Sequence, residues 1–269
     1  MSPLVSIITP CFNSEKFIEK TILSVLCQTY KNIEYIIVDG NSTDRTHQII
    51  QNYKNKLSHV IIEEDEGMYS ALNKGIKIAS GEIIAYINSD DLYFHNTVER
   101  IVNFFNLEPN ISMVYGDLKV IDENDKILYN WFYPKFRFNL FVSNNHCTIG
   151  QVTSFWRSNV HEEVGFFDSS YKLAGDFEFY ARVGEKLKIN KINHFLGYYR
   201  IHQDSLTNNW EEINLQEIQN IHERYLKTRM QKIFRKLLGI IQKTIFRLLN
   251  YRYIFLKLIK SIKALLYLK

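Results

Sequence analysis

The chain has 269 residues, of which 46% are hydrophobic, and its formal net charge is +4. This length and apolar content suffice for one substantial domain with its own core. Three cysteines, Cys11, Cys27 and Cys147, are too few and too scattered for a disulfide framework or a zinc site. The N-terminal residues lack a basic stretch and a small-residue cleavage site, so we expect no export.

The charges are distributed unevenly along the chain. Residues 227–269 contain twelve Lys and Arg and no Asp or Glu, whereas the rest carries 21 basic and 29 acidic residues, a balance of −8. An acidic body with a basic tail argues against nucleic acid as the partner of the body.

The first hundred residues alternate short apolar runs with helical patterns. Runs rich in Val and Ile predict buried parallel strands at residues 4–9, 33–38, 60–62 and 83–87. Apolar residues at helical spacing predict amphipathic helices around 18–26 and 72–79, the second ending at Ser80-Gly81. This alternation indicates βαβ units with right-handed crossovers, which is an α/β fold with a mostly parallel sheet.

The pattern is less regular after residue 110. Apolar runs predict strands at residues 113–115, 127–132 and 152–155, and a helix at 176–185. From about residue 213 the pattern is helical almost to the end. We therefore expect one α/β domain at 1–212, more regular over 1–110 than over 111–212, and a basic amphipathic helical tail at 213–269.

Polar residues follow three of the early strands. They occupy positions 9–13, 39–44 and 88–91. Ligands of parallel α/β sheets bind beyond the carboxyl ends of the strands, so these segments are candidates for a binding site. A lone Asp after a strand is more often a turn or cap residue, and we interpret Asp44 in that way, ahead of the helix through Ile49 and Ile50.

Asp90-Asp91 is a stronger candidate for chemistry. Two adjacent carboxylates repel each other unless a cation or solvent relieves them, and such ligands suit Mg²⁺ or Mn²⁺ with substrate phosphates completing the shell. The alternative is a solvated turn. Neither the dinucleotide fingerprint nor the Walker pattern follows any strand, so hydride transfer and NTP hydrolysis lose their main support. A diphosphate would then be neutralised chiefly by metal.

Five motifs follow one another in order between residues 5 and 91. They are Val5-Ser6-Ile7-Ile8-Thr9-Pro10, Asp39-Gly40-Asn41-Ser42-Thr43-Asp44, Asp65 and Gly67 ahead of Ala71-Leu72-Asn73-Lys74-Gly75-Ile76, Ala79-Ser80-Gly81-Glu82, and Asn88-Ser89-Asp90-Asp91. In this order and spacing the chain resembles the family-2 glycosyltransferases, which have the GT-A fold. The resemblance continues more weakly through residues 150–151, 165–168, 175–178 and 199–202, and it does not cover the tail.

The resemblance implies that residues 1–110 form the nucleotide-sugar-binding half and residues 111–212 the acceptor-binding half, and it implies roles for individual residues. The nucleotide-sugar would be bound by Thr9, Pro10, Asp39, Asn73 and Asp90, with Asp39 accepting a hydrogen bond from the base and Asp90 near the ribose. Asp91 would bind the divalent cation, Mn²⁺ or Mg²⁺, with His202 approaching the metal or diphosphate. Asp176 stands in the position of the catalytic carboxylate and would be the general base.

The acceptor side and the donor identity are less determined by the sequence. Gln151 could hydrogen-bond an acceptor sugar, and Trp156 could stack on one, although buried aromatic residues are more often part of the core. Many relatives carry Tyr where this chain has Phe12, and some carry Arg where it has Leu72. The lost Arg removes a contact to phosphate or base.

The tail interleaves Lys and Arg with Ile, Leu and Phe. Its uncharged runs are far shorter than the roughly 20 apolar residues that span a bilayer, whereas an amphipathic basic helix suits in-plane binding to an anionic leaflet. The alternative is a helical cap on the domain or a contact in a homodimer.

We therefore expect an inverting, metal-dependent glycosyltransferase, cytoplasmic and peripheral on the inner face of the membrane. It would move a sugar from a UDP-linked donor to a hydroxyl of a lipid-linked or cell-surface glycan, as in polysaccharide or lipopolysaccharide biosynthesis. One alternative is a sugar-phosphate nucleotidyltransferase, although residues 10–15 lack its Gly-rich basic loop. The other is a catalytically silent, membrane-associated scaffold with the same fold.

Overall fold

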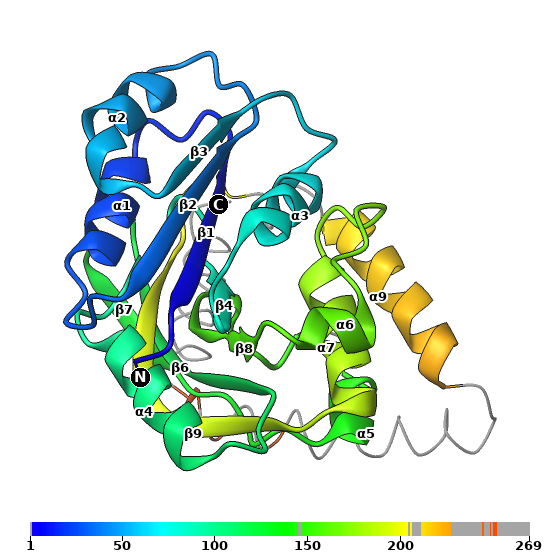
Figure 1. The fold of residues 1–269 in the computed structure, drawn as a ribbon. Helices are drawn as coiled ribbons and strands as arrows, with labels where there is room; N and C mark the ends of the chain where they lie inside the picture. The colour runs from blue at the N-terminus through cyan, green and yellow to red at the C-terminus, as the bar shows by residue number, and fades with distance from the viewer. Residues whose placement is uncertain are drawn as a thin grey trace.

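The computed structural model describes residues 2–144, 147–203, 205, 211–226, 244, 248, 250 and 251. Within these residues the strands form one curled sheet with helices on both faces (Figure 1). The path through the sheet is β3-β2-β1-β4-β8-β6-β9-β5, and β7 pairs with β6.

The N-terminal half of the sheet is parallel. It consists of β1 (Val5–Cys11), β2 (Ile33–Asp39), β3 (His59–Ile62) and β4 (Ile83–Tyr86), connected by α1 (Ile18–Leu26), α2 (Thr46–Asn52), the short turn η1 (Lys54–Lys56) and α3 (Met68–Ile78). The predicted strands and helices of this half are thus confirmed, with ends that differ by up to two residues, except that α3 begins four residues earlier than predicted. In β1 alternate side chains enter two cores, since Val5 and Ile7 face α1 and Ile8 faces α3.

The C-terminal half mixes parallel and antiparallel pairs. Its elements are β5 (Leu92–Tyr93), α4 (Thr97–Leu107), β6 (Met113–Ile121), β7 (Ile127–Trp131), α5 (Phe138–Phe141), η2 (Gln151–Thr153), β8 (Phe155–Arg157), α6 (Val160–Val164), α7 (Gly175–Lys186), β9 (Ile189–Arg200) and α9 (Glu211–Tyr225). The helix predicted at 176–185 is confirmed as α7. The strand predicted at 152–155 is displaced: residues 151–153 form the turn η2, and the strand β8 begins at Phe155.

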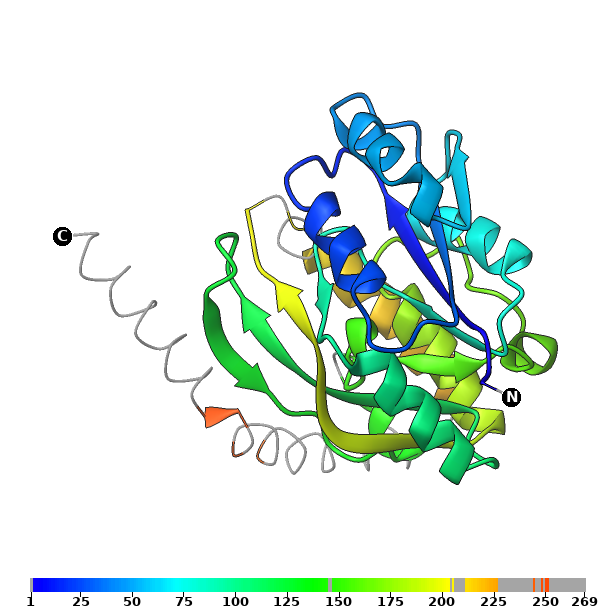
Figure 2. The same cartoon turned by 60° about the vertical axis from the view of Figure 1, so that its left-hand side comes forward.

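The long strand β9 runs parallel to β6 along its length (Figure 2). Near its end it also pairs antiparallel with β5, with Leu92 opposite Tyr198. Its end therefore returns to the segment that leaves β4. No apolar run predicts this strand, because Asn, Lys, His and Gly interrupt its hydrophobic residues.

Helix α9 packs against the same face as α7 (Figure 1). Its residues Ile218 and Ile221 are buried in the core cluster that also contains Phe177 and Tyr180 of α7. No helix of the described residues is long and apolar enough to cross a bilayer. The division of the chain at residue 212 stays a prediction.

Most of the predicted tail lies outside the described residues. Among its described positions, Asn250 forms two hydrogen bonds with the backbone of Phe132, accepting from the amide N at 2.9 Å and donating to the carbonyl O at 3.1 Å. This contact lies just beyond the end of β7.

Trp156 is a centre of the core between the sheet and α7. Its side chain is fully buried against Tyr86, Phe167 and Phe179, and its indole N–H donates to Nε2 of His161 at 2.9 Å. A large buried ring of this kind contributes several kcal/mol to folding.

We therefore predict that Trp156→Ala lowers the free energy of unfolding by about 3–5 kcal/mol, because it leaves a cavity that the aromatic neighbours cannot fill. Urea denaturation followed by fluorescence or circular dichroism measures this loss. Leu107→Ala is the control, since the Leu107 side chain is 81% exposed and its truncation leaves the unfolding midpoint unchanged. An unaltered midpoint for Trp156→Ala would contradict the packing described here.

Candidate active site

The exit of β4 is joined to the end of β9 by reciprocal hydrogen bonds. The carboxylate of Asp91 is fully buried and accepts the backbone N–H of Arg200 at 2.9 Å. In return, Nε of Arg200 donates to the backbone oxygen of Asp90 at 2.8 Å. Burial, together with the neighbouring Asp90 carboxylate, raises the pKa of Asp91 well above its ordinary value.

The Arg200 side chain extends this junction to the β6–β7 turn. Its buried guanidinium donates to the Asp122 carbonyl at 2.9 Å and pairs with Asp125 at 2.6 Å. Asp125 also bonds Lys20 on α1, and the Phe17 ring covers the Arg200 guanidinium at 4.7 Å from the ring centroid. Arg200 thereby connects α1, the turn and the exit of β4.

Asp90 points away from this junction and meets His202. Oδ2 of Asp90 lies 2.9 Å from Nε2 of His202, and the two side chains are 27% and 10% exposed. One carboxylate oxygen and one imidazole nitrogen at this distance are donors that suit Mg²⁺ or Mn²⁺ when substrate phosphates supply further oxygens. In the described part of the chain no group of three or more His, Cys, Asp or Glu forms a fuller set.

The metal role predicted for Asp91 stays a prediction. Its side chain is buried and one oxygen accepts the N–H of Arg200, whereas Oδ2 has no hydrogen-bond partner among the described residues and would need a proton or a cation. Asp90 is a second candidate for the metal, because it is partly exposed and faces His202. The sequence could not distinguish the two neighbours, since the strand alternation that assigns side chains to faces ends at Tyr86.

Asp39, at the end of β2, retains a free acceptor. Oδ1 accepts from the backbone N–H of Ser42 at 3.1 Å and from its hydroxyl at 2.5 Å, while the buried Oδ2 has no hydrogen-bond partner among the described residues. An unpaired buried acceptor is costly unless a ligand satisfies it. Asp39 therefore fits recognition of an N–H group.

Asp65 and Phe12 lie close to Gly40, the residue after Asp39. A Cβ placed on Gly40 would lie 2.6 Å from Oδ2 of Asp65 and 3.5 Å from the Phe12 ring, so both side chains approach this glycine closely. Phe12 is 61% exposed. The sequence predicts no role for Phe12 or Asp65, because a single aromatic residue and a single loop carboxylate form no pattern.

Two of the predicted nucleotide-sugar residues have other partners. Thr9 is buried and its hydroxyl pairs with the Tyr35 hydroxyl at 3.0 Å, whereas Asn73 forms two bonds with the backbone of Phe167, at 2.8 and 3.0 Å. The side chains of both residues therefore hold the fold together. Pro10 is buried within β1 beside Thr9.

The predicted acceptor residues also differ in place. Trp156 is fully buried and cannot stack on a sugar, so this prediction is wrong. Gln151 is half-buried and its side-chain amide donates to the carbonyl of Tyr86 at 2.8 Å, which places it near the end of β4.

Asp176 begins α7. Oδ1 accepts the N–H of Phe177 at 2.7 Å, and the backbone N–H of Asp176 donates to the Tyr69 hydroxyl at 3.1 Å. The side chain keeps partial solvent access, but the surrounding protein desolvates it and raises its pKa to about 6. A carboxylate of this kind is a stronger base than an exposed one and is still ionised near neutral pH.

Polar aromatic residues surround Asp176. Its charge acts on Tyr69, Tyr86, Tyr133, Tyr180 and the thiol of Cys147, each of which has a raised pKa caused mainly by burial. The Tyr86 hydroxyl has no hydrogen-bond partner in the described portion of the structure. These residues come from separate elements, so their proximity to Asp176 could not be predicted from the sequence.

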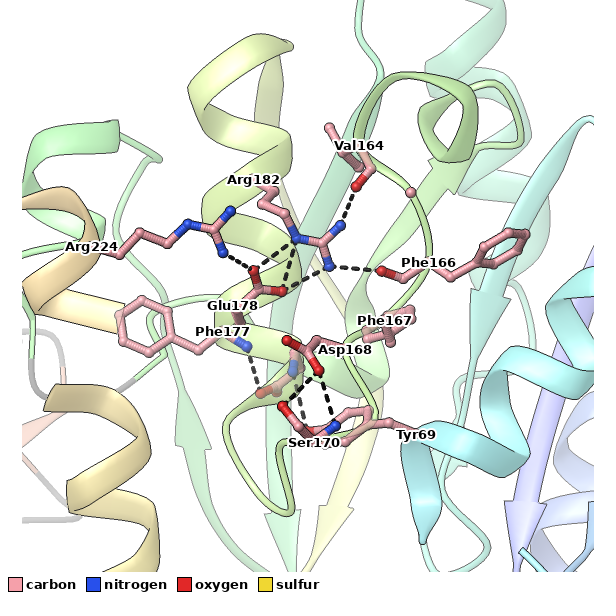
Figure 3. A network of polar contacts seen from close by, with 12 residues as sticks. Tyr69, Val164, Phe166, Phe167, Asp168, Ser170, Phe177, Glu178, Arg182 and Arg224 are labelled. Carbon is pink, nitrogen blue, oxygen red and sulfur yellow. Dashed lines mark hydrogen bonds and ion pairs between the residues drawn. The ribbon is translucent and has the colours of Figure 1, made fainter. Parts of the chain in front are cut away.

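Helices α7 and α9 are tied by an ion-pair network (Figure 3). Buried Glu178 pairs with Arg182 at 2.7 Å and with Arg224 of α9 at 2.8 Å. Arg182 also donates to the carbonyls of Val164 and Phe166. The network fixes α7, which carries Asp176, to its neighbours.

Comparisons with known proteins agree with this architecture. The family "Glycosyl transferase family 2" matches residues 6–165. An uncharacterized glycosyltransferase of Rickettsia typhi is 33% identical over 233 residues, which are 84% of this chain and 72% of the relative. The Escherichia coli UDP-Glc:alpha-D-GlcNAc-diphosphoundecaprenol beta-1,3-glucosyltransferase WfgD is 30% identical over 77% of this chain and 80% of its own length.

A solved structure shares the fold. Residues 1–349 of S. aureus TarS, in complex with UDP-GlcNAc, superimpose with a TM-score of 0.68 and 19% identity, over 88% of this chain and 70% of that chain. The chain therefore belongs to glycosyl transferase family 2 and has the GT-A fold. It is a glycosyltransferase.

The raised pKa of Asp176 predicts a pH-dependent cost to stability. Above pH 6 the desolvated group is ionised in the folded state at a cost, whereas well below pH 4 it is protonated in both folded and unfolded states and costs nothing. We predict that Asp176→Asn raises the free energy of unfolding by up to about 3 kcal/mol at pH 8 and by less than about 1 kcal/mol at pH 4. Urea denaturation at the two pH values tests this, and equal effects at both would contradict it.

Proposed function

We propose that this protein is an inverting, metal-dependent glycosyltransferase that uses a UDP-linked sugar. The observation that carries the proposal is the pair of separate carboxylate environments in a family-2 chain. Asp90 faces His202 in a position suited to metal and diphosphate, whereas Asp176 is a partly exposed, desolvated base with a pKa of about 6. Each carboxylate suits one half of a displacement reaction.

The uracil base is the best fit to the region around Asp39. Its ring N–H would donate to the unpaired Oδ2 of Asp39, and its face would stack on the exposed Phe12 ring. WfgD is named for the donor UDP-Glc and the TarS structure is a complex with UDP-GlcNAc, and both names support a UDP-linked donor.

Asp90 and His202 would hold the divalent cation, Mn²⁺ or Mg²⁺. When bound, such an ion acts as a Lewis acid that neutralises charge on the diphosphate leaving group. Asp91, whose Oδ2 has no hydrogen-bond partner among the described residues, would be a further ligand, and Arg200 holds the backbone that presents Asp90.

Asp176 would act on the acceptor. Its carboxylate takes the proton of the acceptor hydroxyl while that oxygen forms a bond to the anomeric carbon of the donor. The bond from that carbon to the diphosphate oxygen breaks, and the electron pair leaves with UDP. A single displacement with one base opposite the leaving group inverts the anomeric configuration, as in inverting glycosidases.

A lipid-linked or cell-surface glycan is the acceptor that we propose, because the name of WfgD specifies a sugar on diphosphoundecaprenol. Gln151 would lie close to such an acceptor through its contact with Tyr86. Work at the inner face of the cell membrane, as a peripheral protein, fits such an acceptor, and the basic residues of the tail would add attraction to anionic lipids. A homodimer contact through the tail is the alternative use of that segment.

The test measures binding and transfer separately. We predict that Asp90→Asn and Asp176→Asn each lower sugar transfer by about 100-fold or more, since one loses metal-assisted departure and the other the base. The assay contains Mn²⁺, uses UDP-glucose or UDP-GlcNAc as the donor, and uses a GlcNAc-diphospholipid as the acceptor.

Calorimetry with UDP and Mn²⁺ supplies the control. Asp176→Asn retains metal-dependent UDP binding, whereas Asp90→Asn loses it. Wild-type transfer in Asp176→Asn would remove the base from the mechanism. Absence of metal-dependent UDP binding in the unmodified protein would favour the scaffold over the enzyme.

A further inference from the structure

The carboxylate of Glu217, on α9, binds three consecutive backbone amides. Oε1 accepts the N–H of Lys172 at 2.6 Å, and Oε2 accepts those of Leu173 and Ala174 at 3.0 and 2.8 Å. Glu217 is 8% exposed, so these bonds are shielded from water. An ionised acceptor that binds several amides at once is a strong local constraint on the backbone.

This segment leads directly into the catalytic end of α7. Ala174 precedes Gly175, the first residue of α7, and Asp176 follows. The Tyr69 hydroxyl donates to the carbonyl of Leu173 at 2.9 Å and accepts the N–H of Asp176 at 3.1 Å. Glu217 and Tyr69 therefore hold the same short segment from two helices, α9 and α3.

Gly175 lies between these two contacts and packs closely against Tyr69. A Cβ at Gly175 would lie only 2.6–2.8 Å from three carbons of the Tyr69 ring, so the backbone is pressed against that ring. The position of Asp176 thus depends on the amides that Glu217 binds. If Glu217 were removed, those N–H groups would be left without their acceptor.

Helix α9 is itself held in place by contacts on the C-terminal side of Glu217. Nε2 of His222 lies 2.7 Å from the carbonyl of Asn144, and Arg224 pairs with Glu178 of α7 (Figure 3). Together with the buried Ile218 and Ile221, these contacts fix the helix as a rigid support.

We propose that Glu217 is a positioning residue for the general base: it holds the 172–174 segment so that Asp176 meets the acceptor hydroxyl in a single orientation. The proposal rests on the proposed function, in which Asp176 is the base. It makes α9, which lies beyond the residues that the family matches, part of the catalytic apparatus.

Glu217 also acts on Asp176 through its charge. The ionisable groups whose interactions with Asp176 perturb a pKa are Tyr69, Tyr86, Tyr133, Tyr180, Cys147 and Glu217. Glu217 is the acidic member of this set, and its negative charge disfavours ionisation of Asp176. Removing that charge lowers the pKa of Asp176.

The first test needs no substrate. In Glu217→Gln we expect amide hydrogen exchange at residues 172–174 to become about tenfold faster or more, and the pKa of Asp176, followed by ¹³C NMR of its carboxyl group, to fall. Glu217→Asp keeps the charge but is one methylene shorter, so exchange accelerates while the pKa falls less. Glu223→Gln is the matched control on the same helix, because Glu223 is exposed and its carboxylate bonds Gln219. Exchange and pKa values equal to those of the unmodified protein in both Glu217 variants would overturn the proposal.

The second test separates this proposal from the proposed function. With UDP-glucose or UDP-GlcNAc, Glu217→Gln lowers kcat by about 10- to 100-fold with an unchanged KM for the donor, and the acid limb of its pH profile moves to lower pH. A raised donor KM with normal kcat would contradict a positioning role. If Asp176→Asn is inactive while Glu217→Gln has normal kcat, only the role of Glu217 is removed. If Asp176→Asn is fully active, the proposed function itself is wrong.

Discussion

The hydrogen bonds of Arg200 with Asp91 and with the backbone of Asp90 are the constraint on which the proposed donor side depends. They join segments that are 109 and 110 residues apart, the exit of β4 and the end of β9. Because the backbone at Asp90 is held by Nε of Arg200, Asp90 itself is directed towards His202. The buried guanidinium then connects this corner to the β6–β7 turn and, through Asp125, to Lys20 of α1. Contacts from β9, the β6–β7 turn and α1 thus hold the adjacent residues Asp90 and Asp91 in place.

The same chemical group serves different purposes according to its surroundings. Asp91 is buried and bonded to the backbone N–H of Arg200, its neighbour Asp90 is partly exposed and faces an imidazole, and Asp176 is desolvated enough to have a pKa of about 6. Asp39 keeps one oxygen bonded to Ser42 and one without a described partner. Burial and partners, rather than residue type, separate these roles.

The sequence predicts the N-terminal half of the fold well, because parallel strands buried on both faces appear as Val- and Ile-rich runs. It does not predict β9, whose strand conformation comes from pairing with β6 and β5. Among the site residues, Asp39, Asp90 and Asp176 lie in chemically suitable places, whereas Thr9, Asn73 and Trp156 have partners within the protein. Those partners, and the contacts of Glu217, come from residues distant in the chain, and periodicity carries no information about them.

Helix α3 has a consequence for how such an enzyme can change. Tyr69 on this helix contacts the segment at Asp176, and Asn73, one turn along, bonds Phe167, while the helix itself follows directly from the loop that contains Asp65 beside Gly40. Helix α3 therefore extends from the proposed nucleotide site, near Asp65, to the proposed general base, Asp176. Mutations that reshape this loop to admit a new donor would be transmitted to the reacting end, so substrate choice and turnover are not independent traits in this scaffold.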